Sequence, residues 1–381
     1  MKAINSLQVP QQQWLLDLTK ARNSGTKIIG YTPGGYMPEE LIYACGAIPV
    51  ALIRGGDPEP VAASAQYVPR FLDTFARAQI GYRMLEDEPL YKMIDLLVCP
   101  VTDNNIRAIA DCFDFYTDIE VFRFGVPHNK EDDAFEYYLE GLRLLKAKLE
   151  DFTGTKINKE RLEDSVKLMN RMRKLLREFS LMRKSDAAPI SGGDFIRLCH
   201  ASFHIEPATF VSILESRVQE LKRQKAENRN GVRPRVLLTG STLAMGDYKI
   251  PDLLEAAGAD IVVEEFAEGL RNYWEEVRLD GDPLKALADS YFRRRVPPAY
   301  FRPWDETIDF LLRLAKDFRV DAVVWYQLLY RDAYNIQAVY FKQILKDKLG
   351  LQMLELESDY DPSEAGRLRM QIETLIQTVR K

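Results

Sequence analysis

The chain has 381 residues, a formal net charge of −5 and 46% hydrophobic residues. It is too long for one ordinary hydrophobic core, so we expect two or three domains of a globular protein. The acidic balance, with a pI of about 5.6, argues against a nucleic-acid-binding surface. No apolar run reaches the roughly 18 residues of a membrane span. The N-terminal segment MKAINSLQVPQQQ lacks the apolar centre of a secretion signal. These features predict a cytoplasmic protein that binds neither nucleic acid nor membrane.

The first 155 residues predict an α/β domain, because short apolar strands alternate with helices. The expected strands are 27–31, 48–52, 96–101 and 119–124, and the expected helices are 14–21, 38–46, 71–84, one that starts near 105, and 132–152. Pro100 is expected to end its strand, because proline has no N–H to donate. Gly34 and Gly35 follow the first strand, where they either let the backbone approach a ligand or form a plain tight turn.

Residues 156–231 predict a helical region and linker, and residues 232–381 predict a second α/β domain. The helical region contains an amphipathic helix over 158–182, helices over 193–204 and 208–225, and a polar linker over 224–233. The second domain has expected strands at 235–241, 260–264, 322–325 and 352–356, with helices at 248–257, 335–346 and 364–379. The expected fold is therefore two doubly wound, Rossmann-like parallel-sheet domains joined by a helical region. No P-loop is present, so we expect no nucleotide hydrolysis by this chain.

Cysteine and histidine patterns give little support for a metal site. The four cysteines are scattered without a CxxC pair: Cys45, Cys99, Cys112 and Cys199. This usage is typical of buried thiols in a reducing compartment. His200 and His204 would share a helix face with Cys199 nearby, but no fourth ligand is visible, which favours a packed helix. The basic run Arg293–Arg295 is interpreted as a solvated helix face.

Five stretches carry a recognisable order and spacing of residues. They are PEELIYACGAIPV (38–50), Phe75-x-Arg77-x-x-x-Gly81, LLVCPVTDNNIRAIADCF (96–113), LTGS (238–241) with Glu265, Gly269 and Arg271 downstream, and 328–335 followed by LGLQMLELESDY and 366–369. Together they resemble the benzoyl-CoA reductase / 2-hydroxyacyl-CoA dehydratase family over nearly the whole chain. The segments 78–82 and 114–117 are most similar to the smaller catalytic subunit of ATP-dependent benzoyl-CoA reductase.

The resemblance implies a paired subunit that works with other proteins on an acyl-CoA. In that family, cluster-bearing subunits hold a [4Fe–4S] cluster through three cysteines, since thiolates hold iron–sulfur cores. A separate activator hydrolyses ATP with Mg²⁺ and delivers electrons that come indirectly from ferredoxin.

This sequence departs from the family pattern at all three cluster positions. Asp73, Asp103 and Arg331 stand where the family has cysteines, and neither Cys99 nor Cys112 can substitute. We therefore expect that this chain binds no cluster and that the cluster lies on a sister subunit. If the fold is retained, Arg331 should lie within ion-pair reach of at least one aspartate. The alternative is that the three are unrelated surface charges.

The expected function is that of a cluster-free subunit of a benzoyl-CoA reductase. Such a subunit would complete the acyl-CoA cavity together with an iron–sulfur sister subunit and would help to dock the activator. The alternatives are a subunit of a 2-hydroxyacyl-CoA dehydratase, and a non-catalytic scaffold or maturation partner. Glu40 is proposed as a proton carrier, with stabilisation of a helix N-terminus as its alternative role. Tyr36 is expected to face the cavity, and Ser241 and Arg271 are expected to contact CoA phosphates.

Overall fold

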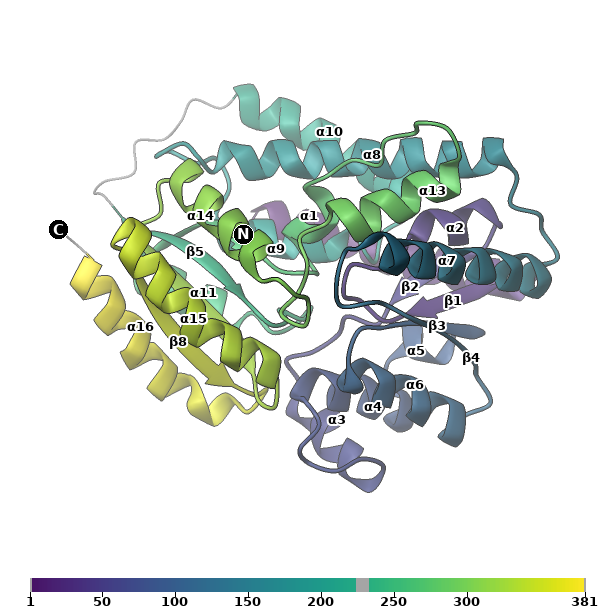
Figure 1. Cartoon of the computed structure of the whole chain (residues 1–381), viewed down its shortest axis with the longest axis horizontal. Helices are drawn as coiled ribbons and strands as arrows, with labels where there is room; N and C mark the ends of the chain where they lie inside the picture. The colour runs from purple at the N-terminus through teal and green to yellow at the C-terminus, as the bar shows by residue number, and fades with distance from the viewer. Residues whose placement is uncertain (1, 224–232, 380–381) are drawn as a thin grey trace.

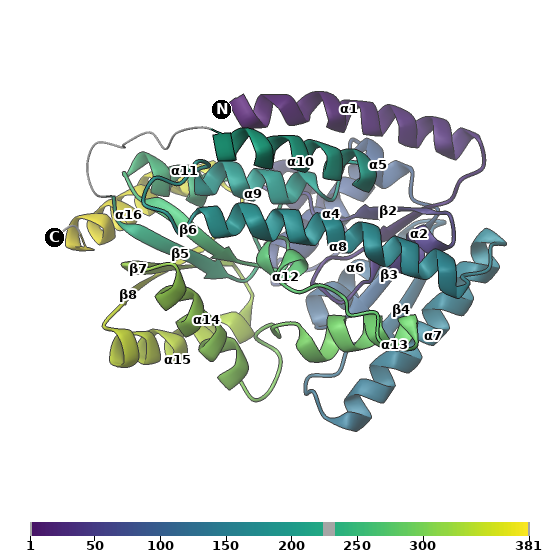
Figure 2. The same ribbon diagram turned by 90° about the horizontal axis from the view of Figure 1, so that it is seen from above.

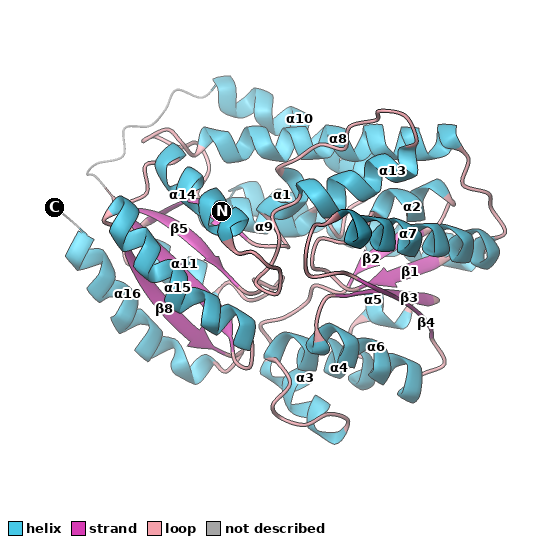
Figure 3. Cartoon of the chain, viewed as in Figure 1, coloured by secondary structure: helices cyan, strands magenta, loops and turns pink. Residues whose placement is uncertain are grey.

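The computed structural model describes residues 2–223 and 233–379 of the chain. Two four-stranded sheets lie side by side with helices packed around them (Figures 1 and 3). All strand pairs within the two sheets are parallel. The predicted fold class, two Rossmann-like α/β units, is confirmed. Among the described residues no helix is long and apolar enough to span a membrane.

The first sheet has the order β2-β1-β3-β4. Its strands are β1 (Ile28–Tyr31), β2 (Ile48–Ala51), β3 (Leu96–Val101) and β4 (Glu120–Gly125). The helices of this half are α1 (Lys2–Asn23), α2 (Glu39–Ala44), α3 (Pro58–Ala63), α4 (Thr74–Leu85), α5 (Pro89–Lys92), α6 (Asn104–Tyr116) and α7 (Asp132–Thr153). The first helix is much longer than predicted, and the short helices α3 and α5 were not predicted.

Pro100 does not end its strand, contrary to the prediction. Strand β3 stays paired with β4 from Leu96 through Val101, and the N–H of Val126 donates to the carbonyl of Val101 (3.1 Å). Backbone groups alternate sides along a strand, and the Val98 carbonyl accepts from Thr32 on the β1 side. The nitrogen of Pro100 therefore points to the β1 side beyond the last β1–β3 pair, where no ladder hydrogen bond is lost.

A layer of long helices crosses both sheets. It contains α8 (Lys159–Met182), α9 (Gly192–Ala201) and α10 (Pro207–Arg223). Seen from above, these helices and α1 lie side by side over the two halves (Figure 2). The apolar stripe of α8 is buried, as its periodicity predicts. Most of the predicted linker, residues 224–232, lies outside the described residues.

The second sheet repeats the order of the first, as β6-β5-β7-β8. Its strands are β5 (Arg235–Gly240), β6 (Asp260–Glu265), β7 (Ala322–Leu328) and β8 (Gln352–Ser358). Its helices are α11 (Lys249–Ala256), α12 (Leu270–Tyr273), α13 (Pro283–Ala288), α14 (Asp305–Asp317), α15 (Asp332–Leu349) and α16 (Ala365–Val379). Helices α12, α13 and α14 were not predicted.

A close backbone contact joins the two halves. The N–H of Gly55 donates to the carbonyl of Met245 (2.9 Å), and the N–H of Met245 donates to the carbonyl of Ile53 (2.8 Å). A Cβ atom on Gly56 would lie 2.6 Å from the backbone of Gly246, so glycine is needed for this approach. The contact holds the carboxyl ends of the two sheets towards each other.

Two local predictions need correction. Arg295 is not on a solvated face: only 6% of its surface is exposed, and its guanidinium stacks on the ring of Tyr291. His204 lies beyond the end of α9, so it does not share a helix face with His200. Both histidines are buried in aromatic packing, against Trp14 and Tyr248. The packed interpretation of the histidines is therefore confirmed.

Candidate functional site

The three positions at which the family resemblance implies cysteines are all helix N-caps. Asp73 caps α4, Asp103 caps α6 and Arg331 precedes α15. Asp103 and Arg331 follow β3 and β7, the strands next to the point where each sheet reverses its order. Ligands of open α/β sheets bind in the crevice at such switch points. The predicted helix over 71–84 contains Asp73, but in the structure Asp73 lies just before the helix, as its N-cap.

Asp73, Asp103 and Arg331 form a buried ionic trio that joins the two halves. Arg331 Nη1 lies 2.8 Å from Asp73 Oδ2 and 3.6 Å from Asp103 Oδ1. The three side chains are 8% exposed or less. The rings of Tyr300 and Tyr334 flank the guanidinium. The predicted contact between Arg331 and an aspartate is therefore confirmed.

The N-termini of helices α4 and α6 stabilise the two carboxylates in addition to Arg331. Asp73 Oδ1 accepts the N–H of Ala76 (2.6 Å), and Asp103 Oδ1 accepts the N–H groups of Asn105 and Ile106. Burial raises the pKa of Asp73, and the charge of Arg331 opposes that shift. The pKa of Arg331 is raised well above its usual value: burial acts against this, but Tyr300 and the aspartates outweigh it.

Asp103 and Arg331 of the trio line a small cavity between the sheets, which we call the Arg331 cavity. Its lining residues are Pro33, Gly34, Phe75, Thr102, Asp103, Ile106, Ser241, Thr242, Ala267, Glu268, Arg271, Pro298, Tyr300, Arg331 and Tyr334. The cavity volume is about 30 Å³, space for about one water molecule. Most of the charged groups in this wall are neutralised by a neighbour.

Ser241 and Arg271 line the Arg331 cavity, but both are already engaged within the protein. Arg271 forms a buried two-pronged ion pair with Glu265, in which Nη2 lies 3.0 Å from Oε2. The Oγ of Ser241 accepts the N–H of Leu328 (3.1 Å). The Arg271 guanidinium is thus held by a carboxylate, whereas the hydroxyl of Ser241 keeps its own donor, and the role of both residues in binding CoA phosphates stays a prediction.

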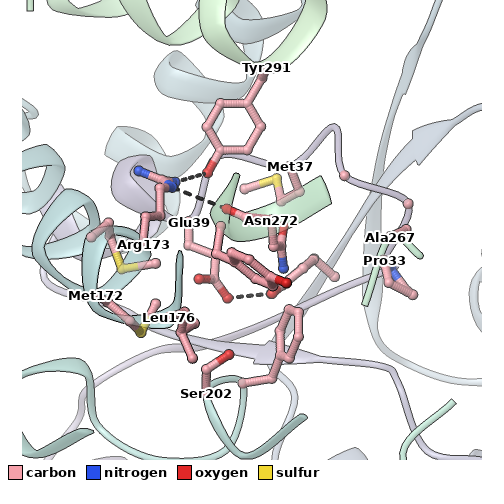
Figure 4. Close-up of a pocket in the computed structure, with 16 residues that line it drawn as sticks. Pro33, Met37, Glu39, Met172, Arg173, Leu176, Ser202, Ala267, Asn272 and Tyr291 are labelled. Carbon is pink, nitrogen blue, oxygen red and sulfur yellow. Dashed lines mark hydrogen bonds between the residues drawn. The ribbon is translucent and has the colours of Figure 1, made fainter. Parts of the chain in front are cut away.

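A second cavity adjoins the first and contains a carboxyl group that the sequence analysis did not single out. We call it the Glu39 cavity; it shares Pro33, Gly34 and Ala267 with the Arg331 cavity. Its other lining residues are Tyr31, Gly35, Met37, Glu39, Met169, Met172, Arg173, Leu176, Ser202, Phe203, Asn272, Tyr273 and Tyr291 (Figure 4). Gly34 and Gly35 have φ values of 128° and 89°, which are accessible to glycine.

Glu39 is partly exposed, and it borders this cavity. The hydroxyl of Tyr31 donates a hydrogen bond to its Oε1 atom (Figure 4). Burial raises the pKa of Glu39 from 4.5 to about 7, while the hydrogen bond from Tyr31 acts in the opposite direction. The carboxyl group is therefore divided between its neutral and charged forms near neutral pH.

Glu40 and Tyr36 are packed differently from the sequence-based expectation. Glu40 is fully buried, and its carboxylate accepts hydrogen bonds from Arg173 Nη2 (2.7 Å) and from the hydroxyl of Tyr291 (2.8 Å). Tyr36 is 1% exposed and stacks on Phe301. Neither residue is in the lining of the two cavities. The proposed roles of Glu40 and Tyr36 stay predictions, and the geometry favours structural roles for both.

Two further charged groups near the cavities were not singled out from the sequence. Arg173 falls within the apolar stripe of α8, four residues after Met169 and three before Leu176, and this misplaced charge was a usable signal. Glu268 lines the Arg331 cavity, and burial raises its pKa to about 7. It lies in an irregular segment between β6 and α12, where no periodicity marks it.

The residues of the trio do not fit an iron–sulfur cluster. A guanidinium group has only hydrogen-bond donors and no atom that can ligate a metal. Both carboxylates are held by backbone N–H groups and by Arg331, whereas iron–sulfur cores are held by thiolates. Cys99 lies inside β3 and Cys112 inside α6, and both are buried. The donor set that replaces the family's cysteines is therefore ionic and self-paired.

Comparison with known proteins shows that the chain is similar to dehydratase and reductase subunits. It is 25% identical to YjiM, a putative dehydratase component of Escherichia coli (strain K12), over 371 residues, which cover 96% of this chain and 95% of the relative. It is 25% identical to a benzoyl-CoA reductase subunit of Thauera aromatica over 291 residues, 74% of either chain. It is 23% identical to the (R)-phenyllactyl-CoA dehydratase beta subunit of Clostridium sporogenes, over 93% of this chain and 92% of the relative.

The family profile described as "2-hydroxyglutaryl-CoA dehydratase, D-component" matches residues 35–379. This match and the relatives agree with the family resemblance inferred from the motifs. The chain therefore belongs to the 2-hydroxyglutaryl-CoA dehydratase D-component family, which includes dehydratase and benzoyl-CoA reductase subunits.

Proposed function

We propose that this chain is the cluster-free subunit of an ATP-dependent benzoyl-CoA reductase. In the proposed complex it pairs with a homologous sister subunit that carries the [4Fe–4S] cluster, and together they enclose the acyl-CoA. A separate activator hydrolyses ATP with Mg²⁺ and passes on electrons that come from ferredoxin. The reaction adds two electrons and two protons to the ring of benzoyl-CoA and yields a cyclic dienoyl-CoA.

The ionic trio carries this proposal. The three positions where the family resemblance implies cluster ligands hold two carboxylates and a guanidinium, and the guanidinium pairs with both carboxylates in a buried site at the crest of both sheets. An internally paired site of this kind supplies no electron-transfer group, so the redox chemistry is assigned to another chain. The similarity to the benzoyl-CoA reductase subunit of Thauera aromatica, over 74% of the chain, supports the choice of reaction.

Co-purification of the chain with its sister subunit tests the proposal. The chain is produced alone and together with the neighbouring gene product, and both samples are assayed for iron and examined by ultraviolet–visible spectroscopy. We expect iron only in the two-chain sample, and ATP-dependent net reduction of benzoyl-CoA after the activator is added. A bound cluster in the single chain contradicts the assignment, and so does a complex that consumes no reductant.

A triple substitution tests whether the trio occupies a former ligand site. The variant Asp73→Cys, Asp103→Cys, Arg331→Cys places three thiols where the ionic groups converge, and thiolates are the ligands that iron–sulfur cores require. After anaerobic reconstitution we expect this variant to bind iron and sulfide. The matched control carries three cysteines at exposed positions of α6 and α15: Arg107→Cys, Asp111→Cys and Gln343→Cys. Equal iron uptake by both variants contradicts a specific site.

A subunit of a 2-hydroxyacyl-CoA dehydratase is the second candidate. It is favoured by the description of the matching family and by the (R)-phenyllactyl-CoA dehydratase beta subunit, which aligns over more of the chain than the reductase subunit does. A dehydratase removes water from its substrate without net reduction. The same reconstituted complex distinguishes the two, because only the reductase consumes two electrons for each molecule of product.

A further inference from the structure

Glu39 is the one acidic side chain that lines the Glu39 cavity in the described part of the chain. We propose that Glu39 is the proton donor to the reduced acyl group, and that Tyr31 is the residue that positions it. This inference rests on the proposed function, and it assigns the proton-transfer step to a residue of this chain.

The geometry leaves one oxygen of Glu39 available to a ligand. Tyr31 donates to Oε1, and no hydrogen bond within the described structure engages Oε2. Residue 39 keeps part of its surface accessible, although the neighbouring Glu40 is fully buried and paired. Oε2 is therefore the oxygen of Glu39 that can carry a proton and pass it to a ligand without breaking a hydrogen bond of the described structure.

Charged and titratable groups surround Glu39 from four elements. Glu40 and Tyr43 lie on α2, Tyr31 on β1, Arg173 on α8, and Tyr291 and Arg295 on or just after the π-helical turn Asp289–Arg294. Arg173 is neutralised by Glu40. Arg295 donates to the carbonyl of Gly35 and has no carboxylate partner in the described structure.

With Glu39 protonated, the two arginines and the Glu40 carboxylate leave one net positive charge beside the cavity. That charge favours a bound anion. Deprotonation of Glu39 cancels it. Burial raises the pKa of Glu39 to about 7, so the acid form is available near neutral pH. The environment therefore suits a site that binds an anion while Glu39 is protonated. Glu39 can then transfer its proton to that anion.

The cavity walls suit an apolar acyl group. Five of the cavity's lining residues are apolar side chains of some size: Met37, Met169, Met172, Leu176 and Phe203. Figure 4 shows Met37, Met172 and Leu176 around Glu39. The cavity volume is only about 30 Å³, so a ring enters by displacing side chains. Methionine side chains are flexible and tolerate such displacement.

Two electrons and two protons reach the acyl group one at a time. One electron, supplied by ferredoxin through the ATP-hydrolysing activator, converts the acyl-CoA into a radical anion. The O–H bond at Glu39 Oε2 then breaks and a C–H bond forms on the ring, which leaves a neutral radical and the Glu39 carboxylate. A second electron from the same source and a proton from water complete the diene. Glu39 regains its proton from water before the next turnover.

Substitution of Glu39 in the reconstituted complex tests this role. Glu39→Gln keeps the shape but cannot donate an acidic proton, so we expect kcat for net reduction to fall by about 100-fold or more. We expect acyl-CoA binding to change by only a few-fold. Glu59→Gln, at an exposed glutamate of α3, is the matched control and should retain the wild-type rate. An E39Q complex that keeps the wild-type rate overturns the proposal.

The pH profile and the infrared spectrum distinguish a proton-donating role of Glu39 from a purely structural one, which would change neither. The wild-type rate should fall above pH 7, and Tyr31→Phe should shift this fall to higher pH, because it removes a hydrogen bond that lowers the pKa of Glu39. The wild-type minus E39Q difference spectrum should contain one protonated-carboxyl band that titrates with a midpoint of about 7, because the signal of Glu268 is common to both proteins and cancels. An unshifted Y31F profile overturns the proposal even if E39Q does not fold. A wild-type complex without net reduction instead refutes the proposed function.

Discussion

The two adjoining cavities use charge in opposite ways. At the Arg331 cavity, Arg331 is paired with both Asp73 and Asp103, and Arg271 is paired with Glu265. In the Glu39 cavity, Glu39 has a tyrosine as its hydrogen-bond partner and no cation within ion-pair distance in the described structure. A paired ion is fixed in its charged state, whereas a carboxyl group without a paired cation can change its protonation. The ion pairs at the Arg331 cavity therefore hold the two halves together, and the Glu39 cavity is suited to proton transfer.

The contrast between Glu39 and Glu40 shows the same difference within two adjacent residues. Glu40 lies under α2 against Arg173 of α8, and Glu39 turns towards the cavity. Neighbours on a helix point about 100° apart, so one of them can be fully buried while the other borders open space. Three changes test this contrast between fixed and variable charge, and a fourth tests the turn that leads to Arg331.

Loss of Arg331 should have the largest effect on stability. Arg331→Met leaves two buried aspartates without a counter-ion, so we expect the free energy of unfolding to fall by about 3–5 kcal/mol. Urea denaturation followed by circular dichroism measures this change. The double variant Asp73→Asn, Arg331→Met removes one of the stranded charges and should recover part of the loss. A cost below about 1 kcal/mol for R331M would show that the trio is not stabilised by pairing.

Glu40→Gln should rank second, because it leaves the buried guanidinium of Arg173 without a carboxylate. We expect a loss of about 3 kcal/mol, at the low end of the range for buried pairs, since glutamine retains an acceptor oxygen. The same urea titration measures it at pH 8, with Glu39→Gln as the matched neighbour. If the two single variants cost the same, the two carboxyl groups do not differ as the structure indicates.

Glu39→Gln should change how stability depends on pH. The pKa of Glu39 is about 7 in the folded chain, compared with a usual value of 4.5, so the folded state holds this proton more tightly. Its stabilising contribution is complete below pH 4.5 and is lost as pH rises through 7. Relative to E39Q, the wild-type chain should therefore lose up to about 3 kcal/mol across this interval. Parallel stability curves for the two proteins would refute the raised pKa.

The smallest expected effect concerns the turn that leads to Arg331. Tyr330 adopts φ of +67°, a conformation that is unfavourable for residues with a β-carbon, and its exposed ring packs edge-on against Phe71. Both Tyr330→Gly and Tyr330→Val remove the ring, but only glycine accommodates the backbone. We expect the valine variant to be about 1–2 kcal/mol less stable than the glycine variant in thermal unfolding. Equal stability would indicate that the turn relaxes without cost.

Local sequence signals predicted most of the fold. The strands and the helices α7, α8, α15 and α16 agree with the prediction to within a few residues, because apolar periodicity and caps act over short distances. The wrong predictions lie where contacts between distant segments decide the outcome. Pro100 was expected to break a ladder, but the side to which its nitrogen points depends on the neighbouring strand. The π-helical turn that contains Arg293 and Arg294 depends on packing between α13 and α7, which sequence periodicity does not encode.

By itself, the sequence determined the order of the strands, the family, and the identity of the three charged residues at the positions where the family resemblance implies cysteines. These are properties of spacing and residue type. Only the tertiary structure decided that the trio forms its ion pairs, that Glu39 and not Glu40 borders the cavity, and that Ser241 and Arg271 are already engaged. The reason is physical: the direction of a side chain and the charge that it meets depend on contacts between segments far apart in the chain, such as α2 with α8, and Asp103 after β3 with Arg331 after β7.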